Sequence, residues 1–137
     1  MTLALRIGLG LLALLELILG LWTSLFPRSF YDLVPTVNLS PPFSEHLFRD
    51  LGGASLGIAV VLIAAVIWPE TRLVIIALLA CTAFTLPHFV FHVGHLEGST
   101  PIEAAFLTAA LATWAALPIA LLLIVRVRSS ATARNRD

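Results

Sequence analysis

Three of the four histidines lie together near the end of one apolar stretch, where they could act jointly. His88, His92 and His95 are four and three residues apart, and residues at this spacing share one face of a helix. Neutral imidazoles arranged in this way can bind zinc, copper, iron or haem, with His46 as the fourth histidine. They can equally carry protons, hold an organic ligand or form structural hydrogen bonds. A helix that ends at Gly94 would align only His88 and His92.

Charged residues in two other apolar stretches are expected at a similar depth. Glu16 lies in the first stretch, and the run from Glu45 to Asp50 opens the second. At about 1.5 Å per helical residue, these positions and the histidines reach the outer half of a bilayer. Ionisable side chains are costly in lipid and often mark functional sites there. We therefore predict one outward-facing polar pocket, formed by Glu16, Glu45, His46, Arg49, Asp50, His88, His92 and His95.

Each of these groups also has an ordinary structural explanation. Glu45 can stabilise the start of a helix through the helix dipole, and Arg49 can pair with a carboxylate while its head reaches the interface. Glu16 can remain protonated and hydrogen-bonded. Cys81, two turns before His88, can be a small core residue. The sequence leaves these alternatives open.

Four long apolar stretches must position these residues. Of the 137 residues, 59% are hydrophobic and only 12% are charged, about half the charged share of a soluble domain, which rules that class out. Eight basic residues are balanced by eight acidic ones, which excludes a nucleic-acid partner. A span needs about 20 apolar residues, and we expect spans at about residues 3–26, 47–68, 73–91 and 102–125. The predicted fold is an all-α integral membrane protein, a four-transmembrane-helix bundle in a single domain over residues 1–125.

The connections between these spans differ in character. Residues 27–44 form a long proline-rich segment that we expect to lie against the outer membrane surface, whereas residues 69–72 form a tight turn. Thr100, Pro101 and Glu103 have the pattern of a capping box at the start of the fourth span.

Small residues predict where the helices touch. Gly53 and Gly57 form a GxxxG pair, and alanines recur at positions 105, 109, 112 and 116. Such residues let helix backbones approach closely in lipid. The contacts could form within one chain, in a homodimer or in a larger membrane complex.

The arginines are unevenly placed and indicate an orientation. Arg6, Arg72 and the arginines of residues 126–137 fall on one side of a four-span protein, and positive residues mark the cytoplasmic side. We predict that both termini are cytoplasmic and that residues 126–137 form an arginine-rich, partly disordered tail. All eight basic residues are arginine, which suggests a GC-rich bacterial genome and a bacterial plasma membrane.

Three sequence runs resemble a family of uncharacterised bacterial four-span membrane proteins. These are the runs at residues 42–52, 69–73 and 87–98, whose recurring features look like EHLxRD and PHxxxHxxHL. The resemblance implies a four-span membrane fold and no particular activity. The opening run from Arg6 to Leu12, with a proline after the span, is also distantly similar to DoxX-like membrane proteins.

The polar pocket favours a binding or accessory role for a small polytopic membrane protein. The ligand would be a small molecule or a metal, or the protein would be an accessory subunit of a membrane complex. One alternative is a proton-coupled small-molecule transporter acting as a dimer. Another is a haem- or metal-dependent membrane redox protein. No nucleophile and no established metal motif stand out in the sequence, so an enzyme is the less favoured class.

Overall fold

The computed structural model describes residues 2–39 and 42–134, and this part of the chain is all helical. Its elements are α1 (Leu3–Leu25), α2 (Pro27–Leu33), the short 3₁₀ turn η1 (Val37–Leu39), α3 (Glu45–Ile67), α4 (Thr71–Val93) and α5 (Pro101–Arg134). Four of these helices, α1, α3, α4 and the Pro101–Val127 part of α5, are long and apolar enough to cross a membrane. The predicted all-α class and its four apolar helices are confirmed.

The last helix is longer than predicted. It continues past the expected boundary at residue 125 as far as Arg134, so most of the expected disordered tail continues the helix. Arg136, which belongs to the same predicted tail, lies outside the described residues. Helix-forming alanine and arginine at positions 131–134 fit this continuation.

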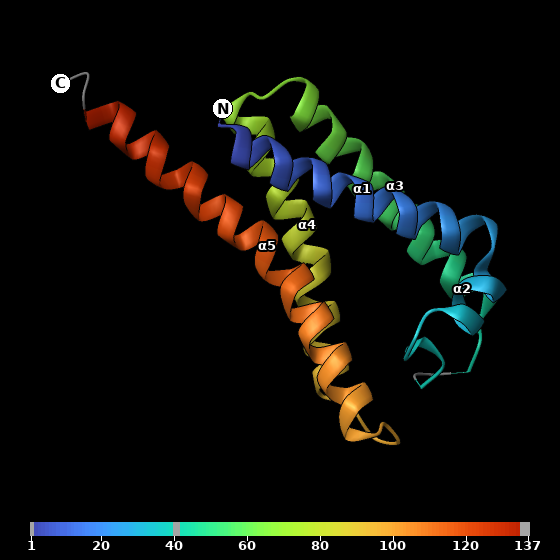
Figure 1. The fold of residues 1–137 in the computed structure, drawn as a ribbon. Coiled ribbons are helices and arrows are strands. Elements are labelled where there is room, and N and C mark those ends of the chain that lie inside the picture. Colours follow the sequence, from blue (N-terminus) through green and yellow to red (C-terminus); the bar gives the residue numbers. More distant parts are fainter. Residues whose placement is uncertain (1, 40–41, 135–137) are drawn as a thin grey trace.

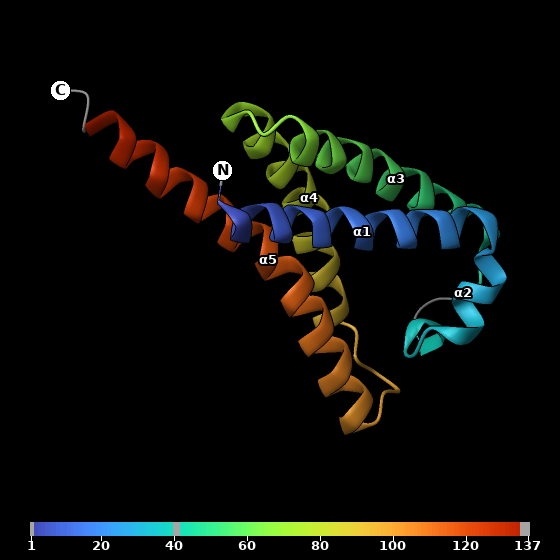
Figure 2. The same ribbon diagram turned by 45° about the horizontal axis from the view of Figure 1, so that its top comes forward.

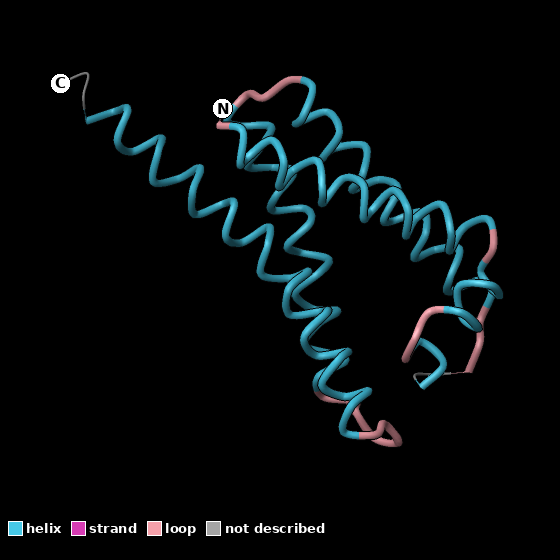
Figure 3. The backbone as a smooth tube through the Cα atoms, viewed as in Figure 1, coloured by secondary structure: helices cyan, strands magenta, loops and turns pink. Residues whose placement is uncertain are grey.

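The four long helices form two antiparallel pairs (Figure 1). Helix α1 packs mainly against α3, and α4 packs mainly against α5. The pairs cross near the start of α1 and diverge toward α2 at one tip and the α4–α5 connection at the other, as a second view confirms (Figure 2). The connections lie only at the helix ends (Figure 3). Polar side chains at the starts of α3 and α5 are therefore held on separate arms.

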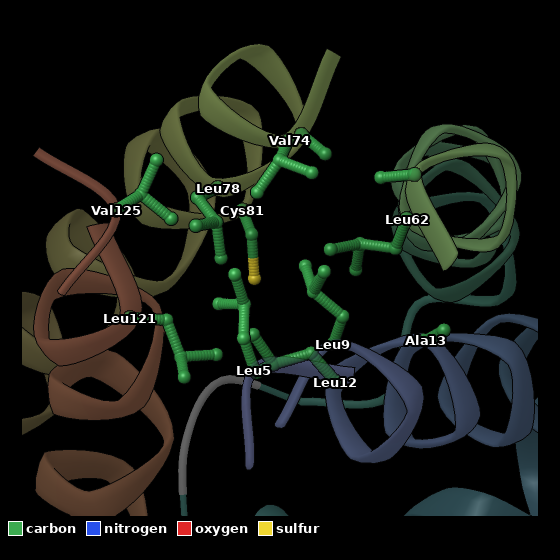
Figure 4. Packing of buried hydrophobic residues seen from close by; sticks show 12 residues of the cluster. Leu5, Leu9, Leu12, Ala13, Leu62, Val74, Leu78, Cys81, Leu121 and Val125 are labelled. Atoms are coloured by element: carbon green, nitrogen blue, oxygen red, sulfur yellow. The ribbon is translucent and has the colours of Figure 1, made fainter. Parts of the chain in front are cut away.

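The apolar core lies where the two pairs cross. Leu9 and Leu12 from α1 meet Leu62 from α3 and Leu78 from α4, with Leu121 from α5 beside them (Figure 4). Large apolar side chains also cover the outside of all four long helices. This distribution suits lipid, where shape complementarity and polar contacts hold helices together more than burial of apolar surface does.

Close packing between α1 and α3 depends on two glycines. A Cβ atom at Gly20 would lie 2.8 Å from Leu56 Cγ, and one at Gly52 would lie 2.8 Å from the backbone nitrogen of Ser24 and also meet the Ser24 hydroxyl. No larger residue fits at either position without a shift of the backbone. These two glycines let the helices approach along the half of α1 that lies beyond the core.

The small-residue contacts predicted from the sequence do not form within the single chain, and contacts in a homodimer or larger complex stay a prediction. Gly53 and Gly57 have no neighbouring atom within 4 Å of an added Cβ, and alanines 105, 109 and 116 are exposed. Helix α3 instead buries the adjacent face, with Gly52, Ser55, Ala59 and Leu62. A spacing of four defines a face but does not say which face meets the neighbour.

The capping box at the start of α5 is confirmed. The Thr100 backbone N–H donates to Glu103 Oε2 at 2.8 Å, and the Glu103 N–H donates to Thr100 Oγ1 at 3.3 Å. Pro101 occupies the first helical position. Glu103 therefore has a structural role at a helix start.

Helix α2 carries an aromatic cluster on the arm that it shares with the start of α3. The rings of Tyr31 and Phe43 lie 5.5 Å apart, Phe43 stacks on Phe48 at 5.8 Å, and the Arg28 guanidinium lies 5.2 Å from the Phe43 ring. Arg28 donates to Asp32 at 2.8 Å, and this hydrogen bond raises the pKa of the guanidinium. The proline-rich segment is thus partly helical and internally packed.

We expect Gly52→Ala to destabilise the protein while Gly53→Ala does not. The new methyl group at position 52 would press against the backbone of Ser24, and such overpacking costs about 1–3 kcal/mol. The same methyl group at position 53 meets open space and improves helix propensity by about 0.5–1 kcal/mol. Thermal unfolding of both variants in one detergent, followed by circular dichroism, measures the difference. Equal melting temperatures would contradict the α1–α3 packing described above.

Candidate functional site

Four polar side chains, one from each long apolar helix, meet directly beyond the apolar core. We call Glu16 of α1, Ser55 of α3, Cys81 of α4 and Trp114 of α5 the Glu16 cluster. Glu16, Ser55 and Cys81 are completely buried. The Cys81 thiol is 3.9 Å from Glu16 Oε1, a distance at which sulfur can donate. Ser55 and Trp114 face the same carboxyl group but do not reach hydrogen-bonding geometry.

Helix periodicity explains why these residues converge. On α1 the buried face runs through Leu9, Leu12 and Glu16, spaced three and four residues apart. On α4 the buried face likewise leads from Leu78 to Cys81. Each polar residue therefore occupies a position that a purely structural helix would fill with an apolar side chain.

The cluster and its surroundings contain polar atoms without partners. Apart from Thr2 at the start of the chain, the buried side-chain atoms that lack a hydrogen-bond partner within the described ranges are Glu16 Oε2, Ser55 Oγ, Thr85 Oγ1, His92 Nδ1 and Trp114 Nε1. Buried polar groups are nearly always paired in folded proteins. These atoms retain hydrogen-bonding capacity that the described chain does not use.

Other hydroxyl groups in the same helices show how such groups are normally satisfied. Thr23, Thr82 and Thr113 each donate to the backbone carbonyl four residues earlier, at 2.7, 2.7 and 2.8 Å. This local bond is the common solution for a hydroxyl in an apolar helix. Ser55 and Thr85 do not use it, so their free hydroxyl groups are not a general property of these helices.

Two of the predicted histidines extend the cluster along α4. The His88 ring lies 5.7 Å from the Trp114 ring and 4.6 Å from the His92 ring. Phe84 completes this aromatic group, with ring centroids 5.8 Å from His88 and 5.7 Å from Trp114. Trp114 therefore connects Glu16 with the histidine stripe.

The third histidine of the stripe lies apart from them. Helix α4 ends at Val93, so only His88 and His92 keep the helical alignment. His95 is exposed, its Nδ1 lies 2.7 Å from the Phe91 carbonyl oxygen, and its ring stacks on Phe91 at 4.1 Å. Of the two alternatives that the sequence left open, the structure has the one in which the helix ends at Gly94.

The residues at the start of α3 form a separate surface group. His46 lies 3.3 Å from Asp50, and Arg49 lies 2.8 Å from Glu45, both as exposed pairs one turn apart. Arg49 Nη1 also donates to the Ser24 carbonyl at 2.5 Å, which joins α3 to the end of α1. A cation at a helix C-terminus is favourable. This arm diverges from the one that carries His88 (Figures 1 and 2).

The eight residues predicted to form one pocket are thus divided by the structure. Glu16, His88 and His92 belong to one connected region, whereas the four residues from α3 and His95 lie elsewhere. Calculated depth gave the height of each residue along its helix but no information on the divergence of the two pairs.

The arrangement does not assemble the predicted metal ligands. Within residues 2–39 and 42–134, no group of three His, Cys, Asp or Glu side chains is placed to hold a metal ion. His46 lies on the other arm from His88 and His92, so it cannot complete their set in this conformation.

A surface depression of about 250 Å³ lies elsewhere, between α1 and α3. Its lining is apolar and consists of Gly10, Ala13, Leu14, Leu17, Ile63 and Val66. No polar group of the Glu16 cluster reaches it. The depression is a feature of the apolar outer face.

Neither Ser55 nor Trp114 was predicted from the sequence. A serine and a tryptophan are common in apolar helices and carry no charge that would single them out. The available signal was positional, because Ser55 lies three residues from Gly52 and four from Ala59 on the buried face of α3.

The four long apolar helices define a class of helical proteins whose segments can cross a membrane. Within that class, residues 4–87 match the profile of a family described as a domain of unknown function, DUF4345, and the chain belongs to this family. The match includes Glu16, Ser55 and Cys81 but ends before His88 and Trp114. No curated protein and no solved structure matches the chain. Membership of an uncharacterised family was predicted, whereas the two motifs and the DoxX likeness stay predictions.

We expect Thr85→Val to be better tolerated than Thr23→Val. Both threonines are buried, but only Thr23 has its hydroxyl bonded to a carbonyl. Leaving a buried hydroxyl unpaired costs about 1–3 kcal/mol, so its replacement by a methyl group should maintain or raise stability at position 85. Melting temperatures of the two variants in ligand-free detergent are the measurement. A larger loss for Thr85→Val would show that its hydroxyl has a structural partner.

Proposed function

We propose that this protein binds a small organic molecule inside the membrane, at the Glu16 cluster. One observation carries the proposal: buried polar atoms from α1, α3 and α5 lack hydrogen-bond partners around one carboxyl group. A ligand with hydrogen-bonding groups would supply those partners. The apolar core on one side and the Phe84, His88 and Trp114 rings on the other would contact its apolar part.

A purely structural role accounts less well for this arrangement. Each unpaired buried group costs about 1–3 kcal/mol, and apolar side chains of the same size would pack at these positions without that cost. Binding sites, in contrast, commonly retain unsatisfied groups that only the ligand pairs.

Proton-coupled transport by a dimer is a second candidate, favoured by the position of the cluster between the two helix pairs. Each long helix packs mainly within its own pair, and the cluster contains residues from both pairs. A change in the angle between the pairs would therefore alter access to Glu16. Transport sites near the bilayer midplane, between two halves that move relative to each other, follow this principle.

We also propose that both termini face the cytoplasm of a bacterial plasma membrane. The start of α1 and the turn between α3 and α4 lie at one end of the molecule (Figure 1). Arg6 and Arg72 are both exposed at this end, in agreement with the excess of positive residues on the cytoplasmic side.

Labelling of single cysteines tests this orientation. Asn38→Cys and Glu70→Cys, each in a Cys81→Ser background, would be exposed to an impermeant thiol reagent in intact cells. We expect labelling at position 38 and protection at position 70 until the cells are opened. The reverse pattern would overturn the proposed topology.

Native mass spectrometry tests the binding function. Wild-type protein, extracted with its surrounding lipid, should carry a small non-lipid molecule that is lost in the double variant Glu16→Leu, Ser55→Ala. Thr82→Val is the matched control, because its hydroxyl is bonded to Leu78 and it lies outside the cluster. Wild-type protein without such a molecule, or equal occupancy in the double variant, would contradict the proposal.

A further inference from the structure

The charge balance around Glu16 indicates which kind of ligand the site would take. Of the acidic residues that the structure describes, Glu16 is the one that is completely buried. Its polar neighbours are Ser55, Cys81 and Trp114, and none of them carries a positive charge. A carboxylate removed from water needs an opposite charge or a dense set of hydrogen-bond donors.

The hydrogen-bond donors at the site do not meet this need. Glu16 Oε2 has no donor, and the Ser55 hydroxyl and the Trp114 indole N–H do not reach bonding geometry. Among the three polar neighbours, the thiol of Cys81 at 3.9 Å is the one that meets hydrogen-bonding geometry, and thiols are weak donors. The carboxyl group is therefore the part of the cluster with the largest unmet interaction.

The aromatic group beside the carboxyl also favours a positively charged ligand. Trp114 lies beside Glu16 and is in ring contact with Phe84 and His88. The face of an indole attracts cations, more strongly than that of other aromatic side chains and most strongly when water is excluded. A carboxylate and an indole on adjacent helices thus favour the same charge.

We propose that the ligand is a monovalent organic cation with apolar substituents, such as a protonated lipophilic amine or a quaternary ammonium ion, which pairs with Glu16 and packs against Trp114. This inference rests on the proposed binding function and specifies its ligand class. The free hydroxyl oxygen of Ser55, which lies beside the carboxyl group, would face the cationic centre.

Two isosteric fluorescent probes test the charge preference. Both carry a dansyl group, and they end in a trimethylammonium or a tert-butyl group, which have the same shape but differ in charge. Binding would be measured by energy transfer from tryptophan to the dansyl group, with the protein in phosphatidylcholine nanodiscs. Empty nanodiscs correct for partition into lipid.

We expect saturable binding of the cationic probe by the wild-type protein, at least about tenfold tighter than that of the neutral probe. Glu16→Gln should weaken the cationic probe by at least about thirtyfold, the lower end of what loss of one partner of a buried charge pair costs. The neutral probe should be unaffected. Glu70→Gln removes an exposed carboxyl outside the cluster and should leave both affinities unchanged.

Other results would overturn the inference. Equal saturable binding of both probes would show that charge does not decide, while the binding function would stand. Binding of neither probe would also refute the cation preference, and the co-purified molecule sought above would still decide the binding function. Should Glu16→Gln fail to fold, the comparison of the two probes on wild-type protein alone still gives the answer.

Discussion

A carboxyl group in the middle of an apolar helix is the constraint on which the rest of this structure depends. Glu16 cannot turn toward lipid without a large cost in free energy, so α1 must direct this face toward the other helices. Ser55, Cys81 and Trp114 then come from three further helices to the same point. The two helix pairs cross at the leucine core, and this group lies directly beyond that core.

Two kinds of contact hold α1 and α3 in register on the far side of Glu16. Gly20 and Gly52 allow the backbones to come close, and the Arg49 guanidinium binds the last turn of α1 through the Ser24 carbonyl. Such steric and polar contacts are effective in lipid, where apolar burial between helices gives little gain. Arg49 thereby acts as a connector between helices, and its pairing with Glu45 keeps it at the surface.

Sequence patterns predicted the elements well and their relative placement poorly. Length and hydropathy located four helices, because a span is a property of a continuous segment. The capping box at Thr100 and Glu103 was also predictable, since both partners lie within one turn. The grouping of Glu16 with Trp114, and its separation from Arg49, depend on the angle between helix pairs, which no local pattern records. Gly53 and Gly57 make no close contact within the chain for the same reason, because their spacing does not state which neighbour the face will meet.

Helix α5 differs from the other three in length, and this has a mechanical consequence. Its 34 residues correspond to about 50 Å at 1.5 Å per residue, whereas the hydrocarbon layer is about 30 Å thick. Pro118 lies inside this long helix, and an internal proline removes one backbone hydrogen bond and favours a bend. This proline lies between Trp114 of the Glu16 cluster and Leu121 and Val125, which pack in the apolar core. A small change of angle at Pro118 would therefore move Trp114 relative to the core and leave the packing of Leu121 and Val125 in place.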